Sequence, residues 1–352
     1  MKARHEYTMT CPSYALSIVI PIYNEEQVLP MLFAELSRAS ETILKPLGRV
    51  ELVFVNDGST DRSWELTARE CHRTPDYVGI NLSRNFGHQL AMAAGLEAAR
   101  GDMVLSMDAD LQDPLSVIPR MVEASRRGYD VVYGTRRERG SEPWGKRVTA
   151  RVFYLLIEKL SGVSIPRNTG DFRLLSRRSL AELTRLRETH RFLRGLVPWI
   201  GFPQTQVFYD RADRAAGETH YPFRKMLLLA FDGIASMSTQ PLRLAYILSL
   251  LLFAVFVGYI LHVLYDHFVQ GAALVPGWTS LMAAITIFGS IQLLLLGVFG
   301  EYLGRIYEQS KNRPLFIIQE VVNGPVAEKA AAEPLASAVA RNSLPASRPV
   351  QP

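Results

Sequence analysis

Cysteine is scarce in this 352-residue chain, and this scarcity excludes a class of protein. The two cysteines, Cys11 and Cys71, cannot form a disulfide framework and suit a reducing compartment. The 24 glycines are too few for a collagen-like chain, and 48% hydrophobic residues are too many for a wholly disordered one. No signal peptide is predicted, because the apolar stretch 15–23 is short and has no small-residue cleavage site.

Charged residues are absent from two long runs, residues 244–265 and 279–300. A helix of either length would extend about 33 Å, enough to cross the hydrocarbon core of a bilayer. A pair of buried core helices is the alternative, but uncharged runs of this length are rare in soluble domains. We therefore expect two transmembrane helices within residues 241–303, which also explains a mean hydropathy of +0.06.

Basic residues flank the two runs and are absent between them. Since the connecting loop 266–277 has no Lys or Arg, the positive-inside rule places it outside and both large ends in the cytoplasm. The sequence thus predicts a multi-pass protein of the inner (cytoplasmic) membrane. The flanking residues are Arg224, Lys225 and Arg243 before the first run, and Arg305, Lys311 and Arg313 after the second.

Apolar residues also form a helical face just before the first run, at residues 222–236. Because a predicted span follows closely, we interpret 222–240 as an amphipathic helix at the membrane surface. A helix packed on the soluble domain is the alternative. The same two interpretations apply with equal support to residues 189–201.

The first 135 residues alternate short apolar runs with helix-like segments. This βαβα order predicts an α/β fold with a doubly wound, mostly parallel sheet. Ligands of such folds bind beyond the carboxyl ends of the strands, so the loops 21–25, 56–59 and 108–110 are expected to converge. The predicted strands are 16–20, 51–55, 78–82, 103–107 and 130–133, and the predicted helices are 25–39, 61–72, 89–100 and 114–127.

These patterns divide the chain into six predicted parts. The soluble cytoplasmic domain comprises residues 15–221 and is preceded by an N-terminal arm, 1–14. A juxtamembrane segment, 304–324, follows the spans. The last part, 325–352, is rich in Ala, Pro and Ser and is expected to be disordered.

The motif Asp108-Ala109-Asp110 lies at the end of a predicted strand, and Gln112 follows it. Carboxylate and amide oxygens suit Mg²⁺ or Mn²⁺, and such ions commonly keep substrate phosphate among their ligands. An isolated D-x-D is more often a solvated turn, so the neighbouring motifs decide between the two interpretations.

Those neighbouring motifs resemble the family 2 glycosyltransferases. The resemblance is carried by SIVIPIYNEE at 17–26, NDGSTD at 56–61 and DADLQDP at 108–114, and it implies the sugar-nucleotide-binding fold called GT-A. Further motifs are similar to those of polyprenyl-phosphate glycosyltransferases, of which the bactoprenol glucosyltransferases are most alike and the dolichol-phosphate mannosyltransferases are relatives. These are RNFGH at 84–88, GTR at 134–136, TGDFRL at 169–174 and GEYLGRIY at 300–307.

The resemblance, which covers about residues 15–320, implies roles for individual residues. The donor would be held by Pro21, Tyr23, Glu25, Asp57 and Asp108. A Mg²⁺ or Mn²⁺ ion would be held by Asp108, Asp110 and Gln112. The acceptor phosphate would be held by Arg136, Arg147 and His220, although relatives often have Lys at the last position. The catalytic residues would be Asp110, Asp171 and Arg173, with Asp171 either a base or a structural residue.

The implied reaction is the inverting transfer of one sugar from a nucleotide sugar, with UDP-glucose expected, to undecaprenyl or a similar polyprenyl phosphate. Mannose from GDP-mannose or an aminoarabinose derivative are alternatives, as is a non-catalytic sugar-nucleotide-binding partner of a lipid flippase. A processive polysaccharide synthase is disfavoured because Q-x-x-R-W is absent from the sequence. The basic stretch 136–151 lacks the interleaved aromatic residues of a nucleic-acid-binding module, so no nucleic-acid partner is expected. The resemblance also implies self-association, for example as a tetramer.

Overall fold

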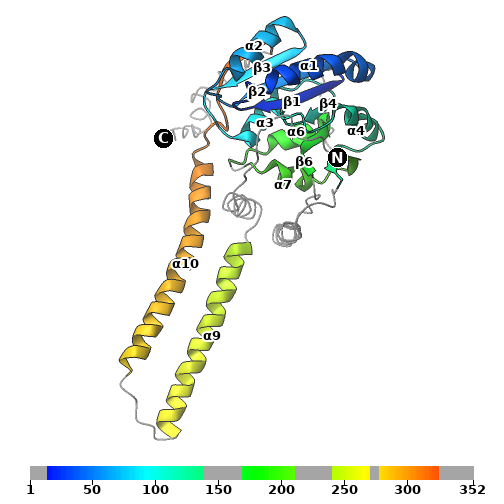
Figure 1. The fold of residues 1–352 in the computed structure, drawn as a ribbon. Helices are drawn as coiled ribbons and strands as arrows, with labels where there is room; N and C mark the ends of the chain where they lie inside the picture. Colours follow the sequence, from blue (N-terminus) through cyan, green and yellow to red (C-terminus); the bar gives the residue numbers. More distant parts are fainter. Residues whose placement is uncertain (1–13, 138–168, 190, 211–239, 270–276, 325–352) are drawn as a thin grey trace, which may run out of the picture.

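The computed structural model describes residues 14–137, 169–189, 191–210, 240–269 and 277–324. Their strands form one sheet in the order β7-β5-β6-β4-β1-β2-β3-β8 (Figure 1). The strands are β1 (Leu16–Ile22), β2 (Val50–Asn56), β3 (Tyr77–Leu82), β4 (Met103–Ser106), β5 (Val131–Arg136), β6 (Thr169–Ser176), β7 (Gln204–Tyr209) and β8 (Ile318–Val322). The α-helices are α1 (Leu29–Ala39), α2 (Ser63–Arg73), α3 (His88–Ala98), α4 (Ile118–Arg126), α6 (Arg177–Arg185), α7 (Leu193–Trp199), α9 (Gln240–Val269) and α10 (Trp278–Ser310).

Four strands form the parallel centre of the sheet, in the order β4-β1-β2-β3. This confirms the predicted α/β fold and the five predicted strands. Strands β6, β7 and β8 were not predicted from the sequence. β6 lies antiparallel between β4 and β5, and β8 lies antiparallel to β3. Polar residues interrupt the apolar pattern in all three strands, which hides them in the sequence.

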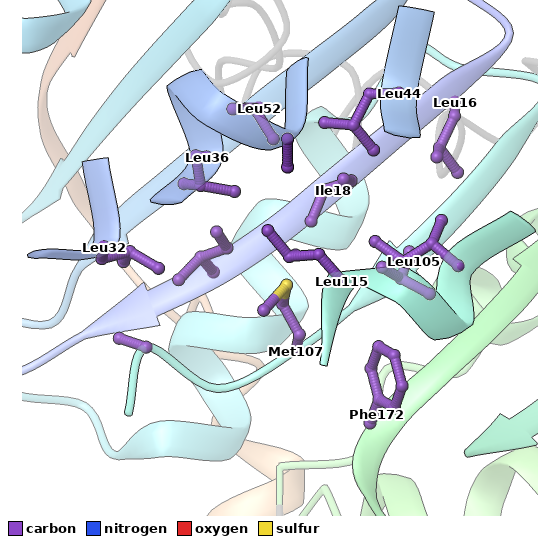
Figure 2. Close-up of a cluster of buried hydrophobic side chains, with 14 of the residues drawn as sticks. Leu16, Ile18, Leu32, Leu36, Leu44, Leu52, Leu105, Met107, Leu115 and Phe172 are labelled. Atoms are coloured by element: carbon purple, nitrogen blue, oxygen red, sulfur yellow. The ribbon is translucent and has the colours of Figure 1, made fainter. Parts of the chain in front are cut away.

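The sheet is buried on both faces, because helices cover each of them. All seven residues of β1 are buried, as expected for a central parallel strand. On one face Leu16 and Ile18 pack with α1 residues such as Leu32, and Figure 2 shows this cluster. On the other face Val19 packs against α3. The approach is close there, since a Cβ on Gly95 would lie 2.3 Å from a methyl group of Val19.

Helix α7 settles one of the two open interpretations of residues 189–201. Its apolar residues Leu193, Leu196 and Val197 are buried in the core beside α3 and β5. Trp199 at its end is 58% exposed. The helix therefore packs in the core of the α/β domain, and the alternative of a membrane-surface helix is wrong for this segment. The helix predicted at 222–240 lies outside the described residues, apart from Gln240.

Helices α9 and α10 run antiparallel, side by side, away from the sheet (Figure 1). They contain the two uncharged runs, 244–265 and 279–300, so both runs are helical as expected. Among the described residues, one stretch, Ile287–Ser310, is long and apolar enough to cross a membrane. A second crossing by α9 stays a prediction.

After α10 the chain returns to the α/β domain and adds β8 to the edge of the sheet. Beyond its ladder with β3, this strand is held by side chains: the Trp64 indole donates to Glu320 at 3.1 Å. Asn323 follows β8 in a left-handed conformation (φ 57°). Its amide donates to the carbonyls of Cys71, Thr74 and Tyr77 at the end of α2 and the start of β3. Part of the predicted juxtamembrane segment 304–324 is thus a strand of the sheet.

We predict that Asn323→Ala loosens β8 more than Asn312→Ala does. Both asparagines have left-handed backbones (φ 57° and 52°), so both substitutions carry a similar backbone cost. Asn323→Ala also removes the partly buried hydrogen bonds to α2 and β3, and a typical hydrogen bond contributes about 0.5–1.5 kcal/mol. Hydrogen–deuterium exchange in detergent should speed up in β8 and β3 for Asn323→Ala alone. Equal exchange in the two variants would show that the side-chain bonds do not hold the strand.

Candidate functional site

The loops after β1 and β2 are joined by hydrogen bonds at the carboxyl edge of the sheet. The Asn24 N–H donates to Ser59 Oγ at 3.0 Å, and Asn24 Oδ1 accepts from the Thr60 N–H at 2.8 Å. Asn24 adopts a left-handed conformation (φ 55°), which turns the chain so that these bonds form. Of the predicted donor residues on this loop, Tyr23 is exposed and Pro21 is buried at the end of β1.

Asp57, another predicted donor residue, is buried and organises the next loop. Its two carboxylate oxygens accept from the backbone N–H groups of Phe86 and Gly87, at 2.7 and 3.0 Å. Burial raises the pKa of this carboxyl group, although the two backbone bonds oppose the shift. Since α3 begins directly after Gly87, Asp57 places His88 at the edge of the sheet.

The loop after β4 carries the predicted metal ligands. Leu111 is left-handed (φ 59°), and Asp110 Oδ1 accepts from the Gln112 N–H at 3.1 Å, so the loop turns tightly. Asp108 Oδ1 and Gln112 Oε1 are buried oxygens without a hydrogen-bond partner among the described residues. Burial raises the pKa of Asp108 to about 6. Two buried oxygens that accept no hydrogen bond fit a hard divalent cation, because such a cation would satisfy both.

Asp171 on β6 is the most heavily paired carboxylate of the site. Its side chain is 3% exposed, and it bonds Arg173 at 2.5 Å, Arg194 at 2.9 Å and His88 at 3.3 Å. Burial by itself would raise the pKa of Asp171, but these three groups lower it well below its ordinary value. A carboxylate held in its charged form in this way is a poor proton acceptor.

His88 connects this carboxylate to the loop after β4. Its Nε2 lies 3.3 Å from Asp171 and 3.5 Å from Asp108. Partial burial opposes the imidazolium charge, but the hydrogen bond to Asp171 and the two carboxylate charges raise the pKa of His88. The three side chains are close enough to hold an ion together. Because Asp171 is already paired with two arginines, Asp108 and Gln112 are better placed to bind a divalent cation.

Arg136, predicted to hold the acceptor phosphate, ends β5 beside the same loop. Its Nε donates to the Tyr209 hydroxyl at 3.2 Å, and its terminal nitrogen lies 3.7 Å from Asp113. Burial opposes its charge, but Tyr209 and the charges of Asp113 and Asp108 raise the pKa of the guanidinium further. The other two predicted phosphate ligands, Arg147 and His220, lie outside the described residues.

The structure therefore gathers most of the described site residues at one edge of the sheet. Sequence reasoning did not assign roles to His88, Arg194 and Tyr209. His88 lies in the RNFGH motif, for which no residue role was predicted, and Arg194 lies within the apolar segment 189–201. Tyr209 carried no signal, because its contacts with Arg136 and Asp113 depend on the pairing of β7 with β5.

Comparison with known proteins gives consistent matches over most of the chain. The sequence model of Glycosyl transferase family 2 matches residues 17–184. The uncharacterized glycosyltransferase YkcC of Bacillus subtilis (strain 168) is 44% identical over 304 residues, which are 86% of this chain and 93% of the relative. The bactoprenol glucosyl transferase of Shigella phage SfII is 39% identical over 309 residues, which are 88% of this chain and 99% of the relative.

A solved structure with partial likeness is that of glucosyl-3-phosphoglycerate synthase from Mycobacterium tuberculosis in complex with uridine diphosphate. It is 18% identical, with a TM-score of 0.43, over 64% of this chain and 79% of the solved one.

The pairing of Asp171 predicts that Asp171→Asn destabilises the protein strongly. The substitution leaves the buried Arg173 without its counter-charge, at a cost of about 3–5 kcal/mol. Asp130→Asn is the control: Asp130 is equally buried, but its partner Arg178 is mostly exposed and stays solvated. Thermal unfolding in detergent should show the larger decrease for Asp171→Asn. An unchanged unfolding temperature with lost activity would instead identify Asp171 as a catalytic base.

Proposed function

Because the chain belongs to glycosyl transferase family 2, we propose that this glycosyltransferase moves one sugar from a nucleotide sugar to a polyprenyl phosphate. The similarity to the SfII bactoprenol glucosyl transferase, over 99% of that protein, supports a bactoprenol-type (undecaprenyl phosphate) acceptor and a glucose donor such as UDP-glucose. The observation that carries the proposal is that Asp108 and Gln112 each have a buried oxygen that accepts no hydrogen bond among the described residues, on the loop whose Asp113 lies 3.7 Å from Arg136.

The proposed reaction breaks the bond between the anomeric carbon and the nucleoside diphosphate, and it forms a bond from that carbon to an acceptor phosphate oxygen. The acceptor attacks opposite the leaving group, so the configuration inverts. A phosphate with a second pKa near 6 is mostly ionised at pH 7, and the nucleophile therefore needs no strong base. This agrees with an Asp171 whose pKa is lowered by its cationic partners.

The protein's own groups would orient the two anionic substrates. Arg136 would hold the acceptor phosphate, because a guanidinium matches the geometry of phosphate oxygens. Asp108 and Gln112, with Asp110 from the same loop, would hold Mg²⁺ or Mn²⁺. Such an ion, when bound, stabilises the negative charge of the leaving diphosphate. Tyr23 and Glu25, on the loop tied to the end of β2, would contact the base and ribose.

We place the reaction at the cytoplasmic face of the membrane. The apolar stretch Ile287–Ser310 in α10 supports a membrane anchor, and α9 runs beside it. The strand β8 follows α10 closely and joins the same sheet as the site, so the anchor is connected to the domain that carries the site. This arrangement would keep a soluble donor site beside a lipid acceptor. The basic flanks of the hairpin support a cytoplasmic position for the site.

The test is the formation of a lipid-linked sugar from radiolabelled nucleotide sugars, with undecaprenyl phosphate and the membrane-bound protein. We expect one sugar per lipid with UDP-glucose, and less product with GDP-mannose. A different preferred donor would change the proposed sugar and leave the acceptor class intact. No product from any donor would support a non-catalytic binding protein, and a polymer would support a synthase.

Asp110→Asn is predicted to lower this transfer at least about a hundredfold, because it weakens charge stabilisation of the leaving group. Asp102→Asn is the matched control, since Asp102 is an exposed carboxylate at the opposite end of β4. It should retain normal transfer. Near-normal activity of Asp110→Asn, with Mg²⁺ or Mn²⁺ present, would contradict the metal assignment.

A further inference from the structure

Three elements meet at Arg136, and the Tyr209 hydroxyl stands at their centre. It accepts a hydrogen bond from Arg136 Nε at 3.2 Å and donates one to Asp113 Oδ1 at 2.5 Å. Arg136 ends β5, Tyr209 ends β7, and Asp113 ends the DADLQD motif after β4. One hydroxyl thus joins the loop that would hold the cation to the side chain that would hold the acceptor phosphate.

The position of this hydroxyl is set by packing of the Tyr209 ring. The ring is buried and meets Phe172 edge to face, with centroids 5.5 Å apart. Phe172 in turn lies against Gly134, where an added Cβ would come within 2.3 Å of the Phe172 ring. Because both rings are confined, the hydroxyl remains at a fixed point relative to β5 and β6.

The geometry also determines which edge of Arg136 faces a ligand. Its Nε is committed to Tyr209, so a phosphate would be met by the terminal nitrogens of the guanidinium. Space beside them depends on Gly170, where an added Cβ would lie 3.1 Å from a terminal nitrogen of Arg136. The buried Asp113 carboxylate, 3.7 Å from Arg136, offsets part of its charge before a phosphate arrives.

We propose that Tyr209 and Asp113 are positioning residues that fix the Arg136 guanidinium relative to the cation-binding loop. The proposal rests on the proposed role of Arg136 in acceptor binding. Tyr209 touches neither substrate in this scheme. It keeps the phosphate-binding edge of Arg136 at a constant place relative to Asp108 and Gln112, so that the acceptor oxygen is aligned with the leaving diphosphate.

Tyr209→Phe tests the proposal, because it removes both hydrogen bonds and keeps the ring against Phe172. We expect the KM for undecaprenyl phosphate to rise about tenfold, as for the loss of a hydrogen bond to a charged group. The Kd for the nucleotide, measured by titration with UDP and Mn²⁺, should stay within about twofold of the wild-type value. A variant that merely folds less well would lose kcat and leave both constants unchanged.

Tyr133→Phe is the matched control. Tyr133 is buried on the same strand as Arg136, and its hydroxyl donates to Gln204 on β7 at 2.9 Å. This control removes one hydroxyl between the same two strands without touching Arg136. The KM for undecaprenyl phosphate should remain normal. Equal KM values for Tyr209→Phe, Tyr133→Phe and wild type would overturn the proposal.

A double-mutant cycle decides whether Tyr209 acts through Arg136. In an Arg136→Lys background, Tyr209→Phe should change kcat/KM for the acceptor by less than about twofold, because Lys has no Nε to be positioned. A full additional tenfold loss in that background would overturn the proposal, since Tyr209 would then act independently of Arg136. The failure of the proposed function looks different: wild type itself would form no lipid-linked sugar, and both proposals would fall together.

Discussion

The ionic balance around the Asp171 carboxylate is the constraint on which the site depends. One buried negative charge is shared by Arg173, Arg194 and His88, which come from three different elements. Breaking such a buried pair is costly, because the remaining charge has no solvent to stabilise it. The balance therefore holds β6, α7 and the start of α3 together at one edge of the sheet. Asp57 contributes to the same result by fixing the backbone before α3.

Asp171 and Asp108 both lie near His88, but their different surroundings suit the two carboxylates to different roles. Asp171 is paired with two arginines, whereas Asp108 has a buried oxygen that accepts no hydrogen bond, lies 3.5 Å from His88 and belongs to a carboxyl group whose pKa is raised to about 6. The first carboxylate is suited to holding cationic side chains, and the second to accepting a cation from solution. Antiparallel pairing of β4 with β6 brings the two groups together, although they are 63 residues apart.

The parallel strands β1 to β4, and the motifs on the loops at their carboxyl ends, could be predicted from the sequence. Strands β1 to β4 are continuous apolar runs, and their loops carry motifs that identify the family. β6 and β7 could not be predicted, because Asp171 and Arg173 in β6, and the two glutamines in β7, are polar residues buried or paired only in the folded protein. The partners of Asp171 and Arg136 were hidden for the same reason, since Arg194 and Tyr209 reach them only through the pairing and packing of distant elements.

We infer that the loop after β4 holds a divalent cation through Asp108 and Gln112 while Asp171 stays paired with its arginines. Titration of Mn²⁺ in the presence of UDP, followed by electron paramagnetic resonance, tests it most directly. Wild type is expected to bind one Mn²⁺ per chain, and Asp108→Asn and Gln112→Leu are expected to bind it at least about tenfold more weakly. Wild-type affinity in both variants would contradict the claim.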